Sequence, residues 1–265
     1  MMSLHIVVCI KQVPVSNNLK IDPVTKNVIR SDAQGMMNPF DKNAIEAALD
    51  LKERHDGEVT LLSMGPKNFE ITLREGLAMG ADRAILLSSR AFGGADTLAT
   101  GYVLSEAIKK IGNVDLIFFG RQSIDADTGQ VGPIVAEFLD MPQATYIHEI
   151  NPVQNGKILA TRLMENMEQV IEVELPAVIT VRSELNEPRY PTLRNIQKSY
   201  QKEVEVWDEN QLAADPNRIG IKGSPTIVRK VWTPENQKKV AESLGNHPDA
   251  AVQKLLEILR DKNIL

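Results

Sequence analysis

Residues that could bind an anion are concentrated between Gly120 and Pro133, in the stretch Gly-Arg-Gln-Ser-Ile-Asp-Ala-Asp-Thr-Gly-Gln-Val-Gly-Pro. The stretch follows a short apolar run at residues 116–119, which is typical of a buried parallel strand. It leads into apolar residues at 131, 134, 135 and 138, the spacing of a helix with one buried face. A strand, a turn of small and polar residues, and a helix start are the parts of an anion site in an α/β protein.

The first backbone N–H groups of a helix have no partner within the helix, and the helix dipole there favours negative charge. We therefore predict that Gly129, Gln130 and Val131 donate backbone N–H groups to a phosphate. Either Thr128 or Asp127 would cap the helix. The alternative is an ordinary connection from strand to helix with a good cap.

The sequence indicates binding rather than covalent catalysis. It contains no G-x-G-x-x-G, no G-x-x-x-x-G-K-[ST] and no G-x-S-x-G pattern, so the usual dinucleotide, P-loop and hydrolase motifs are absent. Asp125 and Asp127 could serve acid–base chemistry, but beside a phosphate we expect them to cap the loop or to accept from ribose hydroxyls. No metal site is expected, because the chain has a single cysteine, Cys9, and its four histidines lack ligand spacing.

Composition excludes several other classes of protein. A net charge of −5 without a basic stripe argues against nucleic acid as a partner. No apolar run approaches the roughly 20 residues needed to span a bilayer, and the apolar segment 5–10 is too short for a signal peptide. We therefore expect a cytoplasmic protein that does not interact with membranes.

The elements that must position the anion site alternate along the first half of the chain. Strands are expected at 6–10, 59–64, 84–87 and 116–119. Helices are expected to follow Asp41 as a cap, to run from about 69 to 80 and from about 96 to 111, and to continue after residue 131. This order predicts an α/β fold: a doubly wound, mostly parallel, Rossmann-like sheet of the adenine-nucleotide-binding type. A small hairpin is expected within residues 17–30.

In the second half of the chain, the pattern changes from alternating strands and helices to a series of short strands. Segments 144–150, 158–163, 169–174 and 177–181 are expected to form a β extension, and a short helix is expected around Asn195. A polar connector at 207–226 precedes two amphipathic helices, at about 234–244 and 249–260. We expect two domains: residues 1–205 bind a nucleotide, and residues 206–265 form a linker and a C-terminal helical arm. The arm either docks on a partner or packs back on its own domain.

In a doubly wound sheet, a ligand sits outside the carboxyl ends of the strands, where the strand order reverses. Four loops could reach that point, at residues 9–12, 64–66, 94–97 and 120–131, and all of them carry small or polar residues. We call this set of loops the cradle and expect it to hold a nucleotide.

Eight short motifs, taken together, resemble the β (small) subunit of electron transfer flavoproteins over nearly the whole chain. They are Val7–Lys11, Asn38–Phe40, Ala78–Arg83, Gly120–Gln122, Ile124–Asp125, Gln130, Leu175–Val178 and Asn186–Tyr190. In the family's signature stretch, around 162–180, Glu165, Gln169 and Pro176 fit the pattern. Asn166 and Met167 depart from it, since small or acidic residues are usual there, so local details of that stretch are not carried over.

The resemblance implies a heterodimer with a flavin-binding α (large) subunit, in which the cradle of the β subunit holds AMP or, in electron-bifurcating members, a second FAD. It places the cofactor-binding residues at Cys9, Asn38, Pro39, Phe40, Asp41, Met64, Ala95, Asp96, Thr97, Thr100, Gly120, Arg121, Gln122, Ser123, Ile124, Asp125, Ala126, Asp127, Thr128, Gly129, Gln130 and Val131. It also implies that Leu193 docks a flavin-dependent dehydrogenase or reductase and that the C-terminal arm wraps onto the α subunit.

Two stretches favour the bifurcating type within this resemblance. Residues 124–133 and the segment Ala91-Phe-Gly-Gly-Ala-Asp-Thr97 look like those of bifurcating members, and Thr97 could donate a hydrogen bond to a flavin ring. NADH would then be the electron donor and ferredoxin one of the acceptors. Alternatives are a non-bifurcating carrier that holds AMP, a stand-alone nucleotide-binding sensor, and an adenylating enzyme of related architecture. The last lacks the Ser-Gly-Gly loop expected after the first strand.

Overall fold

The computed structural model describes residues 3–15, 35–229, 243–244 and 247–265. The chain divides into two compact units, 1–229 and 230–265, which are considered separately. The predicted hairpin within 17–30 lies outside the described residues, and so does almost all of the helix predicted at 234–244.

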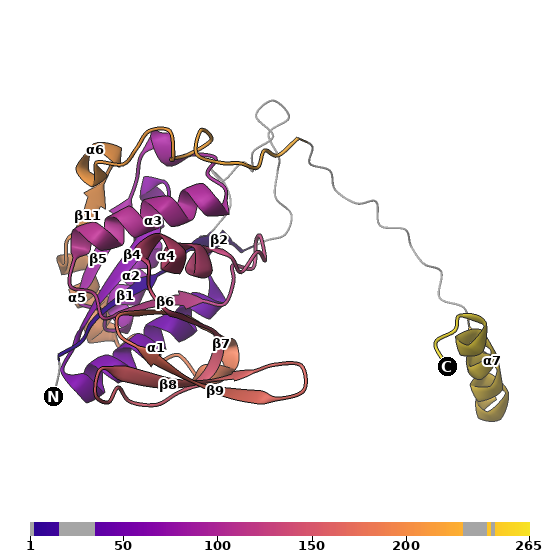
Figure 1. Cartoon of the computed structure of the whole chain (residues 1–265). Helices are drawn as coiled ribbons and strands as arrows, with labels where there is room; N and C mark the ends of the chain where they lie inside the picture. Colours follow the sequence, from indigo (N-terminus) through magenta and orange to yellow (C-terminus); the bar gives the residue numbers. More distant parts are fainter. Residues whose placement is uncertain (1–2, 16–34, 230–242, 245–246) are drawn as a thin grey trace. The chain divides into compact units, whose positions relative to one another are not determined.

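A nine-stranded sheet forms the centre of the first unit (Figure 1). Its strands lie in the order β11 (Val204–Trp207), β5 (Arg83–Leu87), β4 (Glu58–Met64), β1 (His5–Cys9), β6 (Leu116–Gly120), β10 (Ala177–Val181), β7 (Gln143–Ile150), β8 (Lys157–Leu163) and β9 (Glu168–Glu174). The pairs from β11 to β7 are parallel, and β8 and β9 are added antiparallel. The α/β fold expected from the sequence is therefore confirmed.

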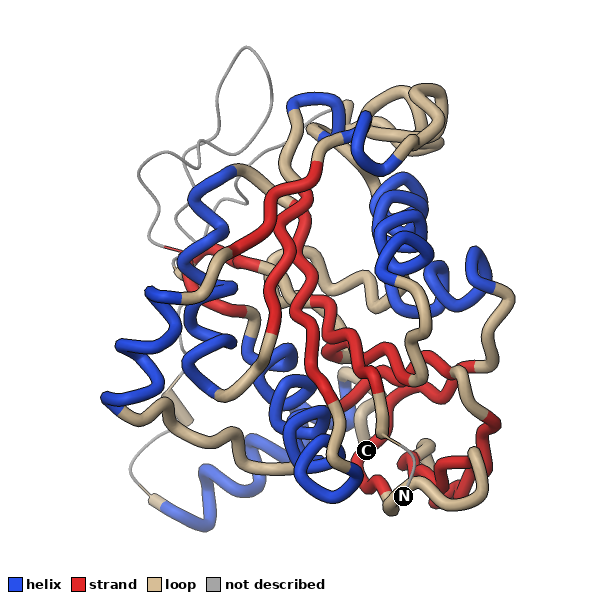
Figure 2. Tube along the Cα trace, turned by 90° about the vertical axis from the view of Figure 1, so that its left-hand side faces the viewer, coloured by secondary structure: helices blue, strands red, loops and turns tan. Residues whose placement is uncertain are grey.

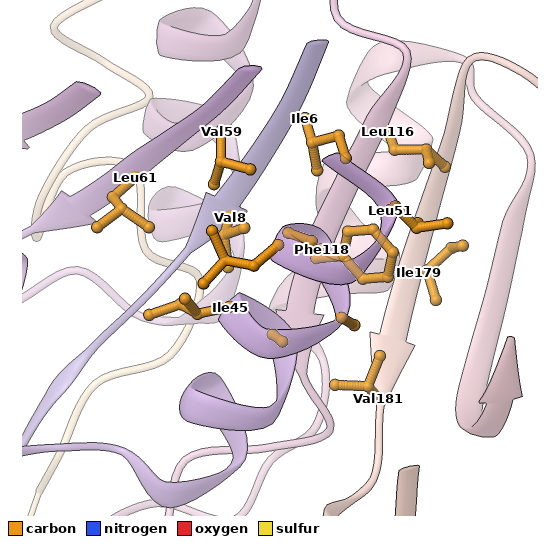
Figure 3. Close-up of a cluster of buried hydrophobic side chains, with 14 of the residues drawn as sticks. Ile6, Val8, Ile45, Leu51, Val59, Leu61, Leu116, Phe118, Ile179 and Val181 are labelled. Atoms are coloured by element: carbon orange, nitrogen blue, oxygen red, sulfur yellow. The ribbon is translucent and has the colours of Figure 1, made fainter. Parts of the chain in front are cut away.

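Helices cover both faces of this sheet, as Figure 2 shows. One face packs on α1 (Pro39–His55) and α2 (Glu70–Met79), and the other packs on α3 (Thr97–Ile111) and α4 (Val131–Leu139). Because side chains alternate along a strand, Ile6 and Val8 of β1 enter the first core, whereas Val7 and Cys9 enter the second. Figure 3 shows the first core, where Phe118 of β6 lies among β-branched and leucine side chains from α1 and neighbouring strands.

The predicted β extension needs a correction. β10 is a central strand, paired in parallel with β6 on one side and β7 on the other. All five residues of β10 are buried, which is the pattern of a parallel strand covered on both faces. The antiparallel addition consists of β8 and β9, joined to β7 through a turn at Gln154–Gly156, where Asn155 and Gly156 have positive φ.

Smaller elements complete the first unit. β2 (Gln12–Pro14) and β3 (Gly35–Met37) form an antiparallel pair, so Pro14 belongs to a short second sheet. Single turns of 3-10 helix occur at Lys67–Phe69, Arg90–Phe92 and Ser183–Leu185. The predicted helix near Asn195 is α5 (Leu193–Gln201), which is capped by Thr192 and packs on α2.

The segment predicted to be a polar connector is part of the first unit. β11 adds a strand to the sheet edge, α6 (Glu209–Leu212) follows, and Trp207, Leu212 and Ile219 are buried in the second core. The three buried apolar side chains are widely spaced among polar residues and turn formers, so the sequence contains no periodic signal for this packing. The first unit thus extends to residue 229.

The second unit contains α7 (Pro248–Asp261), close to the helix predicted at 249–260. Val252, Leu255 and Leu256 of this helix are exposed. Among the described residues, no helix combines the length and the apolar character needed to cross a membrane.

Candidate functional site

The strand order reverses at β1. From β1 the chain builds β4 and β5 on one side and then returns to place β6 on the other. The loops after β1 and β6 therefore meet at the carboxyl edge of the sheet, where a crevice is expected. Both loops belong to the cradle predicted from the sequence.

A buried network fixes these two loops to the start of α1. Asp41 accepts a hydrogen bond from the backbone N–H of Lys11 through Oδ2 (2.7 Å) and one from Asn38 Nδ2 through Oδ1 (2.9 Å). Asn38 Nδ2 also donates to the carbonyl of Gln122 (2.8 Å), and its Oδ1 accepts from the N–H of Ile124 (3.2 Å). Asn38 and Asp41 thus hold the ends of β1 and β6 in one arrangement.

The prediction that Asp41 caps α1 is wrong. The N-cap is Asn38, whose side chain makes no capping bond, and the helix begins with Pro39. Asp41 is buried in the first turn because its carboxylate is used by the strand ends instead. Gly120 permits this close approach: a Cβ atom there would lie 2.4 Å from Asp41 Oδ1 and 2.7 Å from the backbone of Phe40.

Burial dominates the ionisation of two groups in this network. It raises the pKa of Asp41 to about 7, although hydrogen bonds from Asn38, Lys11 and Gly120 and the charge of Lys11 act to lower it. Burial, assisted by the charge of Asp41, raises the pKa of the Cys9 thiol well above its ordinary value. Because the Cys9 side chain lies in the second core, only the backbone of this residue is available to a ligand in the crevice.

A second tie holds the turn that follows β6. The Lys11 ammonium contacts both carboxylate oxygens of Asp125 (2.7 and 2.8 Å) and donates to Ser123 Oγ (3.2 Å). Partial burial acts to raise the pKa of Asp125, but its pKa is lowered overall by the hydrogen bond and charge of Lys11. Lys11 was not among the predicted site residues, although it lies inside the predicted loop 9–12 directly after β1.

The turn predicted to bind a phosphate has a different cap from the one expected. Gln130 is the N-cap of α4 and makes no side-chain capping bond, so neither Thr128 nor Asp127 has that role. Asp127 instead accepts from Gln122 Nε2 (2.8 Å) and has a positive φ, as has Gly129. Within the described part of the chain, the backbone N–H groups of Gly129, Gln130 and Val131 donate no hydrogen bond. They are free to meet an anion.

The starts of α3 and α4 lie together. Thr97, the first residue of α3, places its Oγ1 3.0 Å from Gln130 Oε1 at the start of α4. Asp96 is the N-cap of α3, and its Oδ1 accepts from the N–H groups of Leu98 (3.0 Å) and Ala99 (3.1 Å). Partial burial acts to raise the pKa of Asp96, but hydrogen bonds from Ala99, Thr226 and Leu98 lower it overall. Ala95 and Thr100 are half-buried beside these residues.

The remaining predicted residues surround this centre. Met64 ends β4, next to β1, and packs against the second core. The guanidinium of Arg121 lies over the rings of Phe40 (5.8 Å) and Tyr146 (5.5 Å). Tyr146 was not predicted: it lies where the register between β7 and β10 shifts, and it has a φ of 62°. A tyrosine in a run of strand residues gives no signal for that conformation.

Leu193 lies outside the cradle. It is the first residue of α5 and is 86% exposed, and Tyr190, three positions earlier in the sequence, is 93% exposed. The segment before it is fixed to α1, because Arg189 pairs with Glu46 (2.9 Å) and with Glu53. An exposed leucine on a fixed helix start is available for docking.

Two further features of the first unit bear on where a ligand could bind. Among the described residues, no group of three His, Cys, Asp or Glu side chains could hold a metal ion. A shallow cavity of about 520 Å³ lies at the opposite end of the sheet, lined by His5, Asp115 and Pro176 among others. This cavity is remote from the cradle. We place the candidate site in the cradle because the free backbone N–H groups lie there.

Comparison with known proteins shows which family the chain belongs to. Residues 25–212 match the family model described as the electron transfer flavoprotein domain. The chain is 46% identical over 263 residues to the electron transfer flavoprotein subunit beta of Thermoanaerobacterium thermosaccharolyticum, covering 99% of this chain and all of the relative. It is 42% identical, with the same coverage, to the caffeyl-CoA reductase-Etf complex subunit CarD of Acetobacterium woodii. It is 44% identical to the protein FixA of Azotobacter vinelandii over 92% of this chain and 89% of the relative. The chain therefore belongs to the electron transfer flavoprotein family, as a β subunit.

Proposed function

We propose that this β subunit holds FAD in the cradle, accepts electrons from NADH and divides them between ferredoxin and the flavin of an α subunit. The α subunit would pass its share to a flavin-dependent dehydrogenase or reductase, in the cytoplasm. One observation carries the proposal: uncommitted N–H groups at the start of α4 lie beside the start of α3, whose preceding loop is made of small residues.

The cradle has complementary parts for such a cofactor. The N–H groups of residues 129–131 suit a diphosphate, because each is a donor at a helix start. The segment 38–41 and the turn 120–128 would enclose the adenosine half. Ala95, Asp96, Thr97 and Thr100 would face the isoalloxazine half, and the dipole of α3 favours the negative charge of a reduced flavin.

The chemistry would belong to the cofactor. FAD supplies hydride acceptance and one-electron transfer, neither of which protein side chains perform. The protein would bind and orient it: Thr97 offers a hydroxyl, and the Lys11–Asp125 pair keeps a carboxylate near the phosphates neutralised. No acid, base or nucleophile of the chain is needed for that role.

Two surfaces would serve the partners. The apolar residues of α7 are exposed, and a helix of this type is stable in water when its apolar face is covered. We assign the α subunit as its cover and the dehydrogenase as the partner of Leu193. The similarity to CarD, whose name places it in a reductase complex, supports this assignment.

The second candidate is a non-bifurcating carrier that holds AMP. The donors at residues 129–131 alone would satisfy its phosphate, so this candidate needs no role for Thr97. A stand-alone nucleotide sensor is a third candidate, and it would need no α subunit at all. Size-exclusion chromatography of the chain expressed alone tests it, since a sensor should be a stable, nucleotide-binding monomer.

Cofactor content decides between the first two candidates. The heterodimer is purified with FAD present, and its flavin and AMP are counted after denaturation. NADH is then added without oxygen, together with ferredoxin and the acceptor of the dehydrogenase. We expect one FAD for each subunit and NADH-dependent reduction of ferredoxin. A single flavin with tightly bound AMP, and no reduction by NADH, would leave the AMP-holding carrier.

A further inference from the structure

A segment remote in sequence is fastened to the loop that precedes α3. We call residues 215–226 the strap. Ser224 Oγ accepts from the backbone N–H of Asp96 (2.9 Å), and Thr226 donates to Asp96 Oδ2 through both its N–H (3.1 Å) and its Oγ1 (2.8 Å). One carboxylate oxygen of Asp96 therefore accepts hydrogen bonds from the strap, while the other caps α3.

The strap and the loop fit each other at the backbone as well. Gly220 has a φ of 54°, and a Cβ atom there would lie 2.1 Å from the carbonyl oxygen of Ala91. A Cβ atom on Gly94 would lie 2.6 Å from Ile221. Ser224 Oγ also donates to the carbonyl of Gly220 (2.7 Å), which closes the strap into a turn over the loop. A larger residue at Gly220 would clash with the backbone of the loop, and a larger residue at Gly94, which has a φ of 71°, would have a strained backbone and would displace Ile221.

The start of the strap is fixed to the middle of α3, one turn and more beyond Asp96. The N–H of Asp215 donates to the hydroxyl of Tyr102 (3.0 Å), and the guanidinium of Arg218 lies 4.0 Å from the centre of the Tyr102 ring. The same guanidinium lies 5.2 Å from the ring of Phe138 on α4. The strap is thus anchored on both helices whose starts meet in the cradle, so its contact with Asp96 is not a loose surface contact.

The loop at residues 93–95 has little to hold it otherwise. Gly93 and Gly94 are exposed, and glycine supplies neither a side chain to pack nor a restriction on the backbone. Such a loop samples many conformations unless it is restrained from outside. The hydrogen bond from the Asp96 N–H to Ser224, next to Ala95, is such a restraint.

We propose that Ser224 and Thr226 are positioning residues that preorganise the loop 93–97 for the isoalloxazine ring of FAD. The inference rests on the proposed function, because it concerns the half of the cradle that AMP would not reach. AMP would use residues 38–41 and 120–131, none of which the strap contacts through a hydrogen bond. The strap therefore acts on FAD affinity and leaves AMP affinity unchanged.

The test compares FAD and AMP affinities of the heterodimer after removal of bound nucleotide. Thr226→Val keeps the shape of the side chain and the backbone N–H bond but loses the bond from Oγ1, and Thr226→Ser keeps both bonds. Ser224→Ala removes the acceptor of the Asp96 N–H. Asn217→Ala is the matched control, since it lies in the same strap and its exposed side chain makes none of these contacts.

We expect Thr226→Val and Ser224→Ala to weaken FAD binding about three- to tenfold, the effect of one hydrogen bond, with AMP affinity unchanged. Thr226→Ser and Asn217→Ala should bind both nucleotides as the unmodified protein does. Hydrogen exchange without nucleotide should be faster at the N–H groups of Leu98 and Ala99 in the first two variants, because their acceptor Asp96 is less well held.

The outcomes separate this inference from the proposed function. If the unmodified heterodimer binds FAD and Thr226→Val binds it equally well, the inference is wrong and the proposed function stands. Equal losses of FAD and AMP affinity would also overturn it, since they indicate general loosening of the cradle. If the unmodified heterodimer takes AMP and no second FAD, the proposed function fails, and the role of the strap in flavin binding fails with it.

Discussion

Three carboxylates of the cradle have different hydrogen-bond or ion-pair partners, so they have different structural roles. Asp41 accepts from backbone and amide N–H groups in a buried site, Asp125 is paired with Lys11, and Asp127 accepts from Gln122. Sequence reasoning assigned Asp125 and Asp127 to one loop-capping or ribose-binding role and Asp41 to a helix cap. It could not identify their partners, because Lys11 lies more than a hundred residues from Asp125, and the burial of Asp41 depends on the approach of α1 to Gly120.

The raised pKa of Asp41 predicts how stability depends on pH. Burial raises it from 3.8 to about 7 in the folded protein, so between these values the folded state binds a proton that the unfolded state has lost. Stability contributed by this group is therefore complete below about pH 4 and is lost as pH rises through about 7. The largest possible effect is roughly 4 kcal/mol.

Asp41→Asn should remove that pH dependence. Urea unfolding at several pH values between 4.5 and 7.5 gives the free energy of unfolding for both proteins. We expect the difference between variant and unmodified protein to move in favour of the variant as pH rises across this range. Parallel pH profiles would mean that Asp41 stays ionised throughout, held by its three N–H donors.

Gly129 makes a second prediction at this scale. It has a φ of 61°, and Gly156 has a φ of 73° in the open turn between β7 and β8, so Ala at either site adopts a conformation that costs about 1–2 kcal/mol. Gly129→Ala should also weaken binding of AMP and FAD about tenfold, because it displaces the N–H groups at the start of α4. Fluorescence or calorimetric titration measures this.

Gly156→Ala provides the matched control for Gly129→Ala. It should lose similar stability and bind both nucleotides normally. Equal affinities in the two variants would remove the turn 120–131 from the nucleotide site.

At the scale of helices and strands, periodicity located most elements to within a few residues. The strands β1, β4, β5 and β6 and the helices α2, α3 and α7 lie close to their predicted positions, because apolar spacing and turn residues are local signals. The role of β10 was missed for a different reason. Its sequence Ala-Val-Ile-Thr-Val fits any buried strand, and only pairing with β6 and β7 makes it central.

The start of α5 carries a prediction about docking. Leu193 is 86% exposed, and α5 is held to α2 by Arg74, which donates to the carbonyl of Ser199 (2.6 Å). Leu193→Ala should slow electron transfer to the dehydrogenase about tenfold or more, with flavin content unchanged, because a central apolar anchor of a small interface contributes about 1–3 kcal/mol. The rate is measured by reduction of the partner enzyme at varied concentrations.

Val206→Ala is the corresponding control. Val206 is 43% exposed on the edge strand β11. Its replacement by alanine therefore removes exposed apolar surface of a similar kind at a position away from α5. Loss of flavin from Leu193→Ala would show that this leucine supports the fold. Equal rates in both variants would remove α5 from the docking surface.

At the scale of the whole molecule, the location of the four cradle loops was predictable, but the contacts that hold them were predictable only in part. The four loops were found because carboxyl ends of parallel strands share one edge of a sheet. The docking of the strap on the loop before α3 was not predicted, because residues 215–226 were interpreted as part of a polar connector. Their hydrogen bonds to Asp96 join segments about 130 positions apart in sequence. Pairings of that kind have no local signal, so they appear when the fold is known.

The second unit makes the last prediction. Leu256 of α7 is 38% exposed beside Val252 and Leu255, so one face of this helix presents apolar surface. We propose that the α subunit covers it. Leu256→Glu places a charge in that interface and should weaken association of the subunits at least tenfold, since an unpaired charge is costly to bury.

Gln253→Glu adds the same charge to a neighbouring turn position that lacks an apolar side chain, and it should leave association unchanged. Analytical ultracentrifugation of the two purified subunits at micromolar concentration compares these variants. Because residues 3–15 and 35–229 supply the cradle, the Leu256→Glu subunit should still retain nucleotide. Normal association of Leu256→Glu would mean that α7 packs elsewhere, and joint loss of association and nucleotide would mean that the α subunit completes the cradle rather than covering α7 alone.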